Sequence, residues 1–309
     1  MSKIKVYDSL GFTQRYMASP ELGQLLKGDF RQFFIVRVED MYRLVQESVP
    51  ASRSTGHSFI YITEGEAVMN IGSRRYRTRR GELLLVPAGQ VFSFGNGDVN
   101  KGYLCHFSED MLAGICGNSG PLKEFGFLSS WGYPYHIRTD RQSSQFILQL
   151  FKRLLFEYST YGLGRPAIVR PYLFVLLCEI NQVCHPETPA ARPGNNALFS
   201  EFRELVYAHF RTKHLVKDYA ALLHVTPNHL NKTLKAFTGK SPTRWIDEVI
   251  LSEAKTLLRQ TSFTVSRVAT EVGFEDQSYF ARLFRKYEGV TPTQFRDGIE
   301  KSQRSPNSS

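Results

Sequence analysis

The apolar positions of the last hundred or so residues form one pattern that occurs twice. Ala220 and Ala269 are 49 residues apart, whereas Gly239 and Gly289 are 50 apart, so the second copy has one more residue between its helices. The apolar positions have helical spacing on both sides of a short turn. They are Val216, Tyr219, Ala220, Leu223, Val225, Leu230, Leu234 and Phe237 in the first copy and Val265, Val268, Ala269, Val272, Phe274, Phe280, Leu283, Phe284 and Tyr287 in the second. Each copy therefore predicts a helix-turn-helix unit, whose second helix fits the major groove of DNA.

Between about Phe30 and Phe107 the pattern changes to short apolar segments separated by turn residues. The segments Glu64-Gly65-Glu66 and Pro87-Ala88-Gly89 have the composition of turns, and the first predicts a hairpin. Closely spaced strands with Gly and Pro turns favour a small β-barrel or jelly roll. The candidate strands are 33–36, 59–63, 67–71, 74–78, 83–86, 91–94 and 103–107.

Helical spacing returns after Gln142, in two stripes joined near Gly162-Leu163-Gly164. Two antiparallel helices of this kind would expose a surface suited to dimerisation, or their stripes would cap the barrel instead. The stripes are Phe146, Leu150, Phe151, Leu154 and Leu155, and Ile168, Tyr172, Leu173, Leu176, Leu177 and Ile180.

The fold class that follows is α+β with two domains. Residues 185–197, HPETPAARPGNNA, have no periodicity and are expected to link the domains. We assign 29–184 to a β-barrel with a helical pair, 198–300 to the all-α tandem helix-turn-helix domain and 301–309 to a flexible tail. Residues 1–28 are either an N-terminal arm that closes over a ligand or a disordered terminus.

Composition limits the class of protein. A chain of 309 residues fits about two domains, and 42% hydrophobic residues allow packed cores. No run of about 18 apolar residues and no apolar signal core is present, so we expect no membrane partner and a cytoplasmic location. The net charge of +10 suits a polyanion, although solvated lysines would give the same value. The four cysteines are too few and too scattered for a disulfide framework, and we expect reduced, mostly buried thiols.

The outward positions of the second helix in each unit carry hydrogen-bonding and basic side chains. Thr226 can cap the first of these helices, with Pro227 at its first position. Gly273 suits the turn of the second unit. Asn can bond adenine, Lys can meet guanine or phosphate, and Arg282 is the residue expected to bond guanine. The candidate DNA-binding residues are Asn228, His229, Asn231, Lys232 and Lys235, and Gln277, Ser278, Tyr279, Arg282, Arg285 and Lys286.

The segment from about Leu198 to Glu300 resembles the DNA-binding domain of AraC/XylS-type transcription regulators. The second unit carries the family signature as VATEVGFEDQSYFARLFRKYEGVTPTQFR, from Val268 to Arg296, and the first unit, from Tyr219, matches more loosely. The resemblance implies a ligand-responsive regulator that binds double-stranded DNA as a homodimer, with RNA polymerase as a further partner. It places base contacts on Asn228, Asn231, Lys232, Ser278 and Arg282.

The stretch GELLLVPAGQVF, from Gly81 to Phe92, resembles the second cupin motif. Phe92 stands where that motif has its terminal histidine, and His57 lacks the second histidine of the first motif, although Glu64 lies further on. Transition-metal cupins need about three or four converging His and Glu ligands, so we expect no metal, no other cofactor and no enzyme.

With the metal ligands missing, the barrel is expected to bind a small-molecule effector, as sensor domains of the resembled family do. Strand alternation suggests the pocket residues, for each of which packing in the core or exposure is an alternative. They are Arg53, Tyr61, Phe92, Phe94, Tyr103 and His106. Two other functions stay open: a cupin-type enzyme with a DNA-binding regulatory tail, and an architectural DNA binder without an effector.

Overall fold

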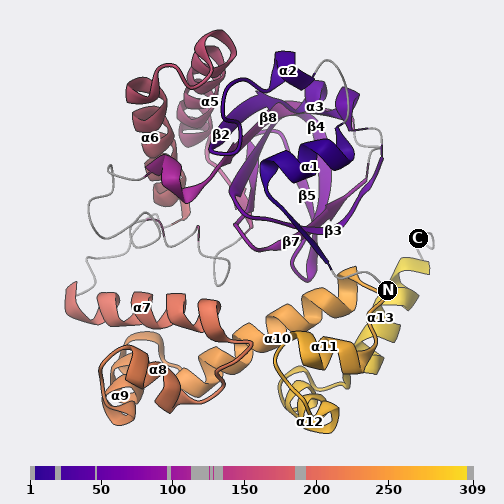
Figure 1. The fold of residues 1–309 in the computed structure, drawn as a ribbon, viewed down its shortest axis with the longest axis vertical. Helices are drawn as coiled ribbons and strands as arrows, with labels where there is room; N and C mark the ends of the chain where they lie inside the picture. Colours follow the sequence, from indigo (N-terminus) through magenta and orange to yellow (C-terminus); the bar gives the residue numbers. More distant parts are fainter. Residues whose placement is uncertain are drawn as a thin grey trace. The chain divides into compact units, whose positions relative to one another are not determined.

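The computed structural model describes residues 4–17, 22–45, 47–95, 99–112, 125, 128, 135–184 and 193–304. The chain divides into two compact units, 2–188 and 189–309 (Figure 1). The first unit is a curled sheet with helices and the second is all-helical, which confirms the predicted fold class. Most of the predicted 185–197 linker lies outside the described residues, and helix α7 begins at Pro193.

The first unit is built on a single curled sheet. Its strands pair in the order β1-β3-β7-β4-β6-β9, with β5 on β4 and β8 between β2 and β4. Every pair is antiparallel except β1 with β3. The strands are β1 Lys5–Tyr7, β2 Phe33–Arg37, β3 Val49–Ser54, β4 His57–Ile71, β5 Arg74–Arg79, β6 Glu82–Val86, β7 Val91–Phe94, β8 Asn100–Phe107 and β9 His136–Arg138.

The predicted hairpin at Glu64-Gly65-Glu66 is wrong, because β4 continues through it to Ile71. The first half of β4 pairs with β6 and β8, and the second half pairs with β5 and β7. Between the halves the register with β8 shifts at Ile62/Glu64, and Gly65 has φ of +73°. A Cβ at Gly65 would overlap the carbonyl oxygen of Val99. The glycine therefore makes a bulge that bends one strand between two parts of the sheet, and not a turn.

Short helices lie at the start of the chain and between strands, and two long helices follow the sheet. They are α1 Ser9–Tyr16, α2 Leu22–Leu25, α3 Val38–Leu44, the 3₁₀ turn η1 Glu109–Leu112, α5 Arg141–Tyr161 and α6 Pro166–Cys184. Tyr61 and Tyr103 of the sheet stack on Phe151 of α5 at ring-centroid distances of 5.5 Å. One face of the sheet is thus covered by the helical pair.

Helix α6 is long and apolar enough, by length and composition alone, to cross a membrane. Its sequence is not an unbroken apolar run, because Arg170 and Glu179 interrupt it. Its apolar stripe belongs to the core of the first unit, with Val169, Leu173, Leu176, Leu177 and Ile180 fully buried.

The cysteines differ in part from expectation. Cys105 is buried, Cys184 is half-buried and Cys178 is exposed, while Cys116 lies outside the described residues. The expectation of mostly buried thiols is wrong for Cys178, which is on the outer side of α6.

The second unit contains two helix-turn-helix pairs joined by the long helix α10. Tyr219 and Leu230 in the first pair, and Phe280 and Phe284 in the second, are fully buried. Helix α10 supplies Ile246, Val249 and Ile250 to the same core. The helices are α7 Pro193–His209, α8 Val216–Leu222, α9 Pro227–Thr238, α10 Pro242–Gln260, α11 Val265–Glu271, α12 Gln277–Glu288 and α13 Pro292–Arg304.

The sequence determines where α9 and α12 begin and end. The hydroxyl of Thr226 accepts a hydrogen bond of 3.1 Å from the His229 amide, with Pro227 at the first helical position. Asp276 caps α12 by accepting from the amides of Ser278 and Tyr279. Gly239 and Gly289 end the two helices in the left-handed conformation.

Candidate nucleic-acid interface and ligand pocket

Helices α9 and α12 each bury one apolar face and leave a polar face open. Leu230 and Leu234 of α9 and Phe280 and Phe284 of α12 point into the core. All the candidate DNA-binding side chains lie on the exposed faces: Asn228, His229, Asn231, Lys232, Lys235, Gln277, Ser278, Tyr279, Arg282, Arg285 and Lys286. Their contact with bases or phosphates stays a prediction.

The length of helix α10, which joins the two units, is comparable with one turn of DNA. Helix α10 has 19 residues, and a helix of that length spans about 28 Å. One turn of B-DNA, which separates successive contacts along one face, is about 34 Å. In Figure 1, α9 and α12 lie on the same side of the second unit, with α10 running between them.

The basic side chains of these faces are free to meet an anion. Within the described part of the chain, no carboxylate forms an ion pair with Lys232, Lys235, Arg282 or Arg285. The Arg282 guanidinium lies 5.9 Å from the centre of the Tyr279 ring. Tyr279 and Arg282 therefore lie side by side on the exposed face of α12, in the first half of that helix.

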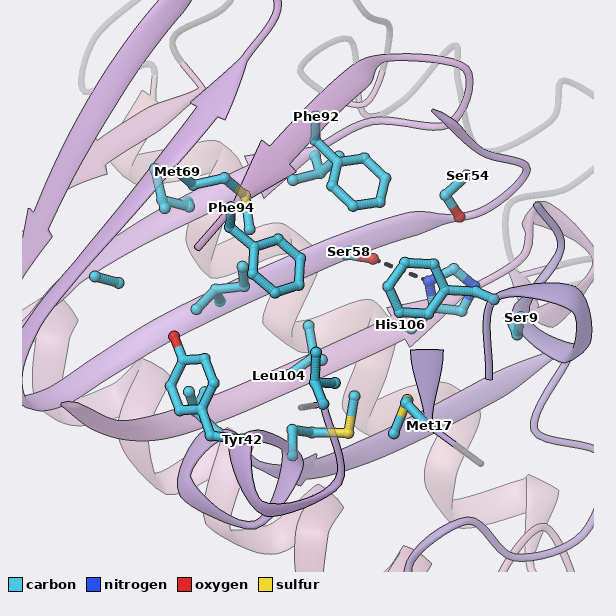
Figure 2. A pocket seen from close by; sticks show the side chains of 18 of the residues that line it. Ser9, Met17, Tyr42, Ser54, Ser58, Met69, Phe92, Phe94, Leu104 and His106 are labelled. Atoms are coloured by element: carbon cyan, nitrogen blue, oxygen red, sulfur yellow. Dashed lines mark hydrogen bonds between the residues drawn. The ribbon is translucent and has the colours of Figure 1, made fainter. Parts of the chain in front are cut away.

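A cavity of about 120 Å³ lies in the first unit, between the inner face of the sheet and helices α1 and α3 (Figure 2). Helix α1 forms part of its wall through Ser9, Phe12 and Thr13, and Met17 follows that helix. The remaining wall comes from α3 and the strands. The lining residues outside α1 include Phe34, Val38, Met41, Tyr42, Val45, Ser54, Ser58, Ile60, Ala67, Met69, Leu84, Val86, Phe92, Phe94, Leu104 and His106.

Of the pocket residues predicted from the sequence, Phe92, Phe94 and His106 line the cavity. Tyr61 and Tyr103 do not line it, because both face α5 on the other side of the sheet, where the Tyr61 hydroxyl bonds Ser144 Oγ at 2.7 Å. Arg53 also lies outside the lining, and its guanidinium bonds the carbonyl oxygen of Gly89 at 2.6 Å.

Strand alternation in the sequence is sufficient to predict which side chains of a strand face the cavity together. Tyr103 and His106 are three residues apart in β8, so they cannot point to the same face. With Leu104 and His106 inward, the register of β8 on β4 puts Ser58 and Ile60 inward as well. The contribution of α1 had no such signal, because residues 1–28 show no pattern that ties them to the sheet.

His106 is bonded within the wall of the cavity. Its Nδ1 is 2.9 Å from Ser58 Oγ, and its ring stacks on Phe34 at a centroid distance of 5.0 Å. Burial, with a smaller contribution from His57, lowers the pKa of His106 from 6.5 to about 3. The imidazole is therefore neutral at neutral pH and acts as a hydrogen-bonding group without charge.

This burial predicts an acid-sensitive first unit. The unfolded chain binds a proton at His106 below pH 6.5 and the folded chain does so only near pH 3, so stability is lost as pH falls between those values. Between pH 7 and pH 5 the loss from this residue should be about 2 kcal/mol. Urea unfolding at both pH values, compared with His106→Asn, measures it; an equal pH dependence in the two proteins would contradict the prediction.

The remnant of the first cupin motif has its own partners. His57 Nδ1 accepts a hydrogen bond of 3.2 Å from the Ala88 amide, and His57 Nε2 is 3.6 Å from a Glu109 carboxylate oxygen. In the ranges that the structure describes, no three His, Cys, Asp or Glu side chains gather as a metal site.

Two family models match separate parts of the chain. An AraC-like ligand binding domain matches residues 42–169, and a helix-turn-helix domain matches residues 219–298. The first range contains strands β3 to β9, and the second runs from within α8 to within α13.

Known regulators are similar over most of this chain. The HTH-type transcriptional regulator YisR of Bacillus subtilis is 24% identical over 246 residues, which are 77% of this chain and 84% of that protein. The arabinose operon regulatory protein of Salmonella typhimurium is 24% identical over 249 residues, 76% of this chain and 82% of that protein. Among solved structures, fatty-acid-bound ToxT of Vibrio cholerae matches at 12% identity and a TM-score of 0.38, covering 88% of this chain and 97% of that one.

Proposed function

We propose a function from the family of this chain, which belongs to the AraC-type transcription regulators by its ligand-binding domain and the helix-turn-helix domain that follows it. The protein is a DNA-binding transcription regulator with a ligand-binding N-terminal unit. An effector in the cavity changes how the tandem helix-turn-helix units bind DNA. The free energy that drives this change is the difference between the effector's affinities for the DNA-binding and the non-binding conformation of the protein.

The observation that carries the proposal is the pair of exposed, polar and basic second helices, α9 and α12, which the long helix α10 joins in one unit. The test is selection of bound fragments from a random double-stranded DNA pool at near-physiological salt. We expect a motif with two short conserved blocks about one turn apart. Binding without enrichment of any motif, with the chain alone or with an effector added, would contradict sequence-specific regulation and favour an architectural role.

The N-terminal arm is proposed to sense the effector. Helix α1 supplies part of the cavity wall, and β1 joins the sheet through parallel pairing with β3. The hydroxyl of Tyr158 in α5 accepts from the Lys27 amide at 2.8 Å and donates to the Lys27 carbonyl at 2.9 Å. The last residues of the arm are thus bonded to the end of α5.

We further propose that the protein is a homodimer through the outer side of α5 and α6. Phe146, Phe156, Tyr161 and Val175 are large apolar side chains that stay exposed there. Apolar patches on a single protein surface commonly mark an interface. The alternative, that both stripes only cap the barrel, accounts for the buried residues of the pair and not for these four.

Replacing Phe156, which is 53% exposed, with Glu is expected to weaken the dimer at least about tenfold, because a charge would be desolvated at the interface. Sedimentation equilibrium measures the association constant. Val99→Glu is the matched control, since Val99 is exposed in the same unit and belongs to neither helix. Identical association constants for Phe156→Glu and the natural chain would rule out this face.

A regulatory role without catalysis is also part of the proposal, supported by relatives that are transcription regulators. RNA polymerase is the proposed partner at promoters, and the cytoplasm is the proposed location. Substoichiometric transition metal in the purified protein is the expected result of metal analysis; one metal ion per chain would favour the cupin-type enzyme instead.

A further inference from the structure

Three polar side chains of the cavity wall gather toward one end. Figure 2 shows Ser9, Ser54 and His106 there, together with Phe92 and Met17, while Met69, Phe94 and Tyr42 lie toward the other end, with Ser58 and Leu104 between them. The polar residues at the first of these ends, the polar end, also contact one another. Ser58 bonds His106, and Ser54 Oγ accepts from the amide of Gly56, whose Cα lies against the His106 ring.

The lining carries no charge. Among the described residues that line the cavity there is no Asp, Glu, Lys or Arg, and His106 is neutral. The arginine that the sequence placed in the pocket, Arg53, is bonded elsewhere. An ionised ligand would therefore lose its hydration without gaining an opposite charge, which is strongly unfavourable.

One polar atom in the wall has no partner. Ser9 is only 6% exposed, and its Oγ has no hydrogen bond within the described structure. The other hydroxyls of the wall differ, since Thr13 donates to the Leu10 carbonyl and Ser58 pairs with His106. A buried hydroxyl without a partner is uncommon in folded proteins and calls for a missing group. Its place in the lining indicates that the missing group belongs to a ligand.

The size of the cavity limits the apolar part of that ligand. The volume is about 120 Å³, and an engineered apolar cavity of about 150 Å³ is known to bind benzene. A ligand of about the size of one aromatic ring with a small substituent therefore fills the cavity as a whole.

We propose that the effector is an uncharged molecule with an apolar body of about one ring and a single hydrogen-bonding group, which the Ser9 hydroxyl binds at the polar end of the cavity. This inference rests on the proposed function, because it names the chemistry of the effector that the regulator senses. The bond to Ser9 would attach the ligand directly to α1, the helix by which the N-terminal arm closes the cavity.

Acetophenone and benzoate test the charge requirement on the full chain. The two probes have nearly the same shape, but one ends in a neutral carbonyl group and the other in a carboxylate. Saturation-transfer NMR titrations should give a dissociation constant for benzoate at least about 100-fold higher than for acetophenone. Comparable constants for the two probes, or no binding of acetophenone, would overturn the proposal.

Ser9→Ala tests the hydrogen bond. It should weaken acetophenone binding about 3- to 10-fold, because a hydroxyl that donates to the carbonyl is lost. Ser108→Ala is the matched control, since Ser108 Oγ is also buried without a partner and lies outside the lining. Unchanged affinity in Ser9→Ala would refute the role of Ser9.

The outcomes separate this inference from the proposed function. If the protein binds both probes equally and still selects a DNA motif, the proposal of an uncharged effector is wrong and the proposed regulatory function stands. A protein that binds acetophenone selectively and selects no DNA motif would leave the cavity assignment standing and overturn the regulatory function.

Discussion

Replacing Gly273 with Ala is expected to lower the free energy of unfolding of the second unit by about 3 kcal/mol or more. Under conditions in which this unit of the variant is unfolded, DNA binding should be lost. Gly273 has φ of +93°, and a Cβ there would overlap the carbonyl oxygen of Arg211. The Arg211 segment is fixed, because its guanidinium bonds the Glu271 carbonyl at 3.3 Å and the buried Glu253 carboxylate at 3.2 Å. The chain preceding the first pair thus packs directly on the turn of the second.

Urea unfolding followed by Trp245 fluorescence, with Trp131 replaced by Phe, measures this loss. Gly289→Ala is the matched control: its φ is +76° and no atom lies within 4 Å of an added Cβ. It should cost only about 1 kcal/mol, the price of a left-handed alanine. Equal losses for the two variants would show that contact with Arg211 contributes nothing.

In the first helix-turn-helix pair, the opposite substitution, to glycine, is expected to stabilise the turn. His224 stands at the position of Gly273 in the repeat and has φ of +54°. His224→Gly relieves about 1–2 kcal/mol of left-handed strain and costs about 0.5–1 kcal/mol of chain entropy, so a gain of about 0.5 kcal/mol is expected. Because His224 is exposed and no chain packs on it in the described structure, a side chain is tolerated there and excluded at Gly273.

The repeat made the second unit predictable, because each of its signals is local. Thr226 before Pro227 and the glycines at 239 and 289 determine helix ends within a few residues of themselves. The prediction of an amphipathic face followed from spacing, and the side chains that it placed outside are exposed.

The first unit was less predictable, because its decisive features depend on residues far apart in the sequence. Gly65 has the local composition of a turn, but the pairing of β4 with β8, which brings Val99 against Gly65, makes this segment a bulge. The face on which Tyr103 lies depends on helix α5, whose Phe151 covers it. The role of Ser9 in the wall depends on the folding of α1 onto the sheet, which no local pattern encodes.

Replacing Arg282 with Ala is expected to weaken binding to the preferred DNA site by about 1–3 kcal/mol, or roughly 5- to 150-fold. Arg282 is exposed on α12 one helical turn after Ser278, and within the described chain no carboxylate neutralises it. A guanidinium there can bond O6 and N7 of guanine together, and neither bond survives the substitution. The loss should therefore be confined to one base position, which becomes relaxed in a repeated fragment selection.

Arg285→Ala is the matched control, because Arg285 is exposed one turn of helix further along the same face and is expected to hold a phosphate. It should weaken binding to all sequences similarly and reduce the slope of log affinity against log salt by about one. The two arginines thus separate sequence readout from phosphate attraction on one helix. Equal losses on every sequence for Arg282→Ala would assign Arg282 to the backbone as well, and base readout by α12 would then depend on Gln277, Ser278 and Tyr279.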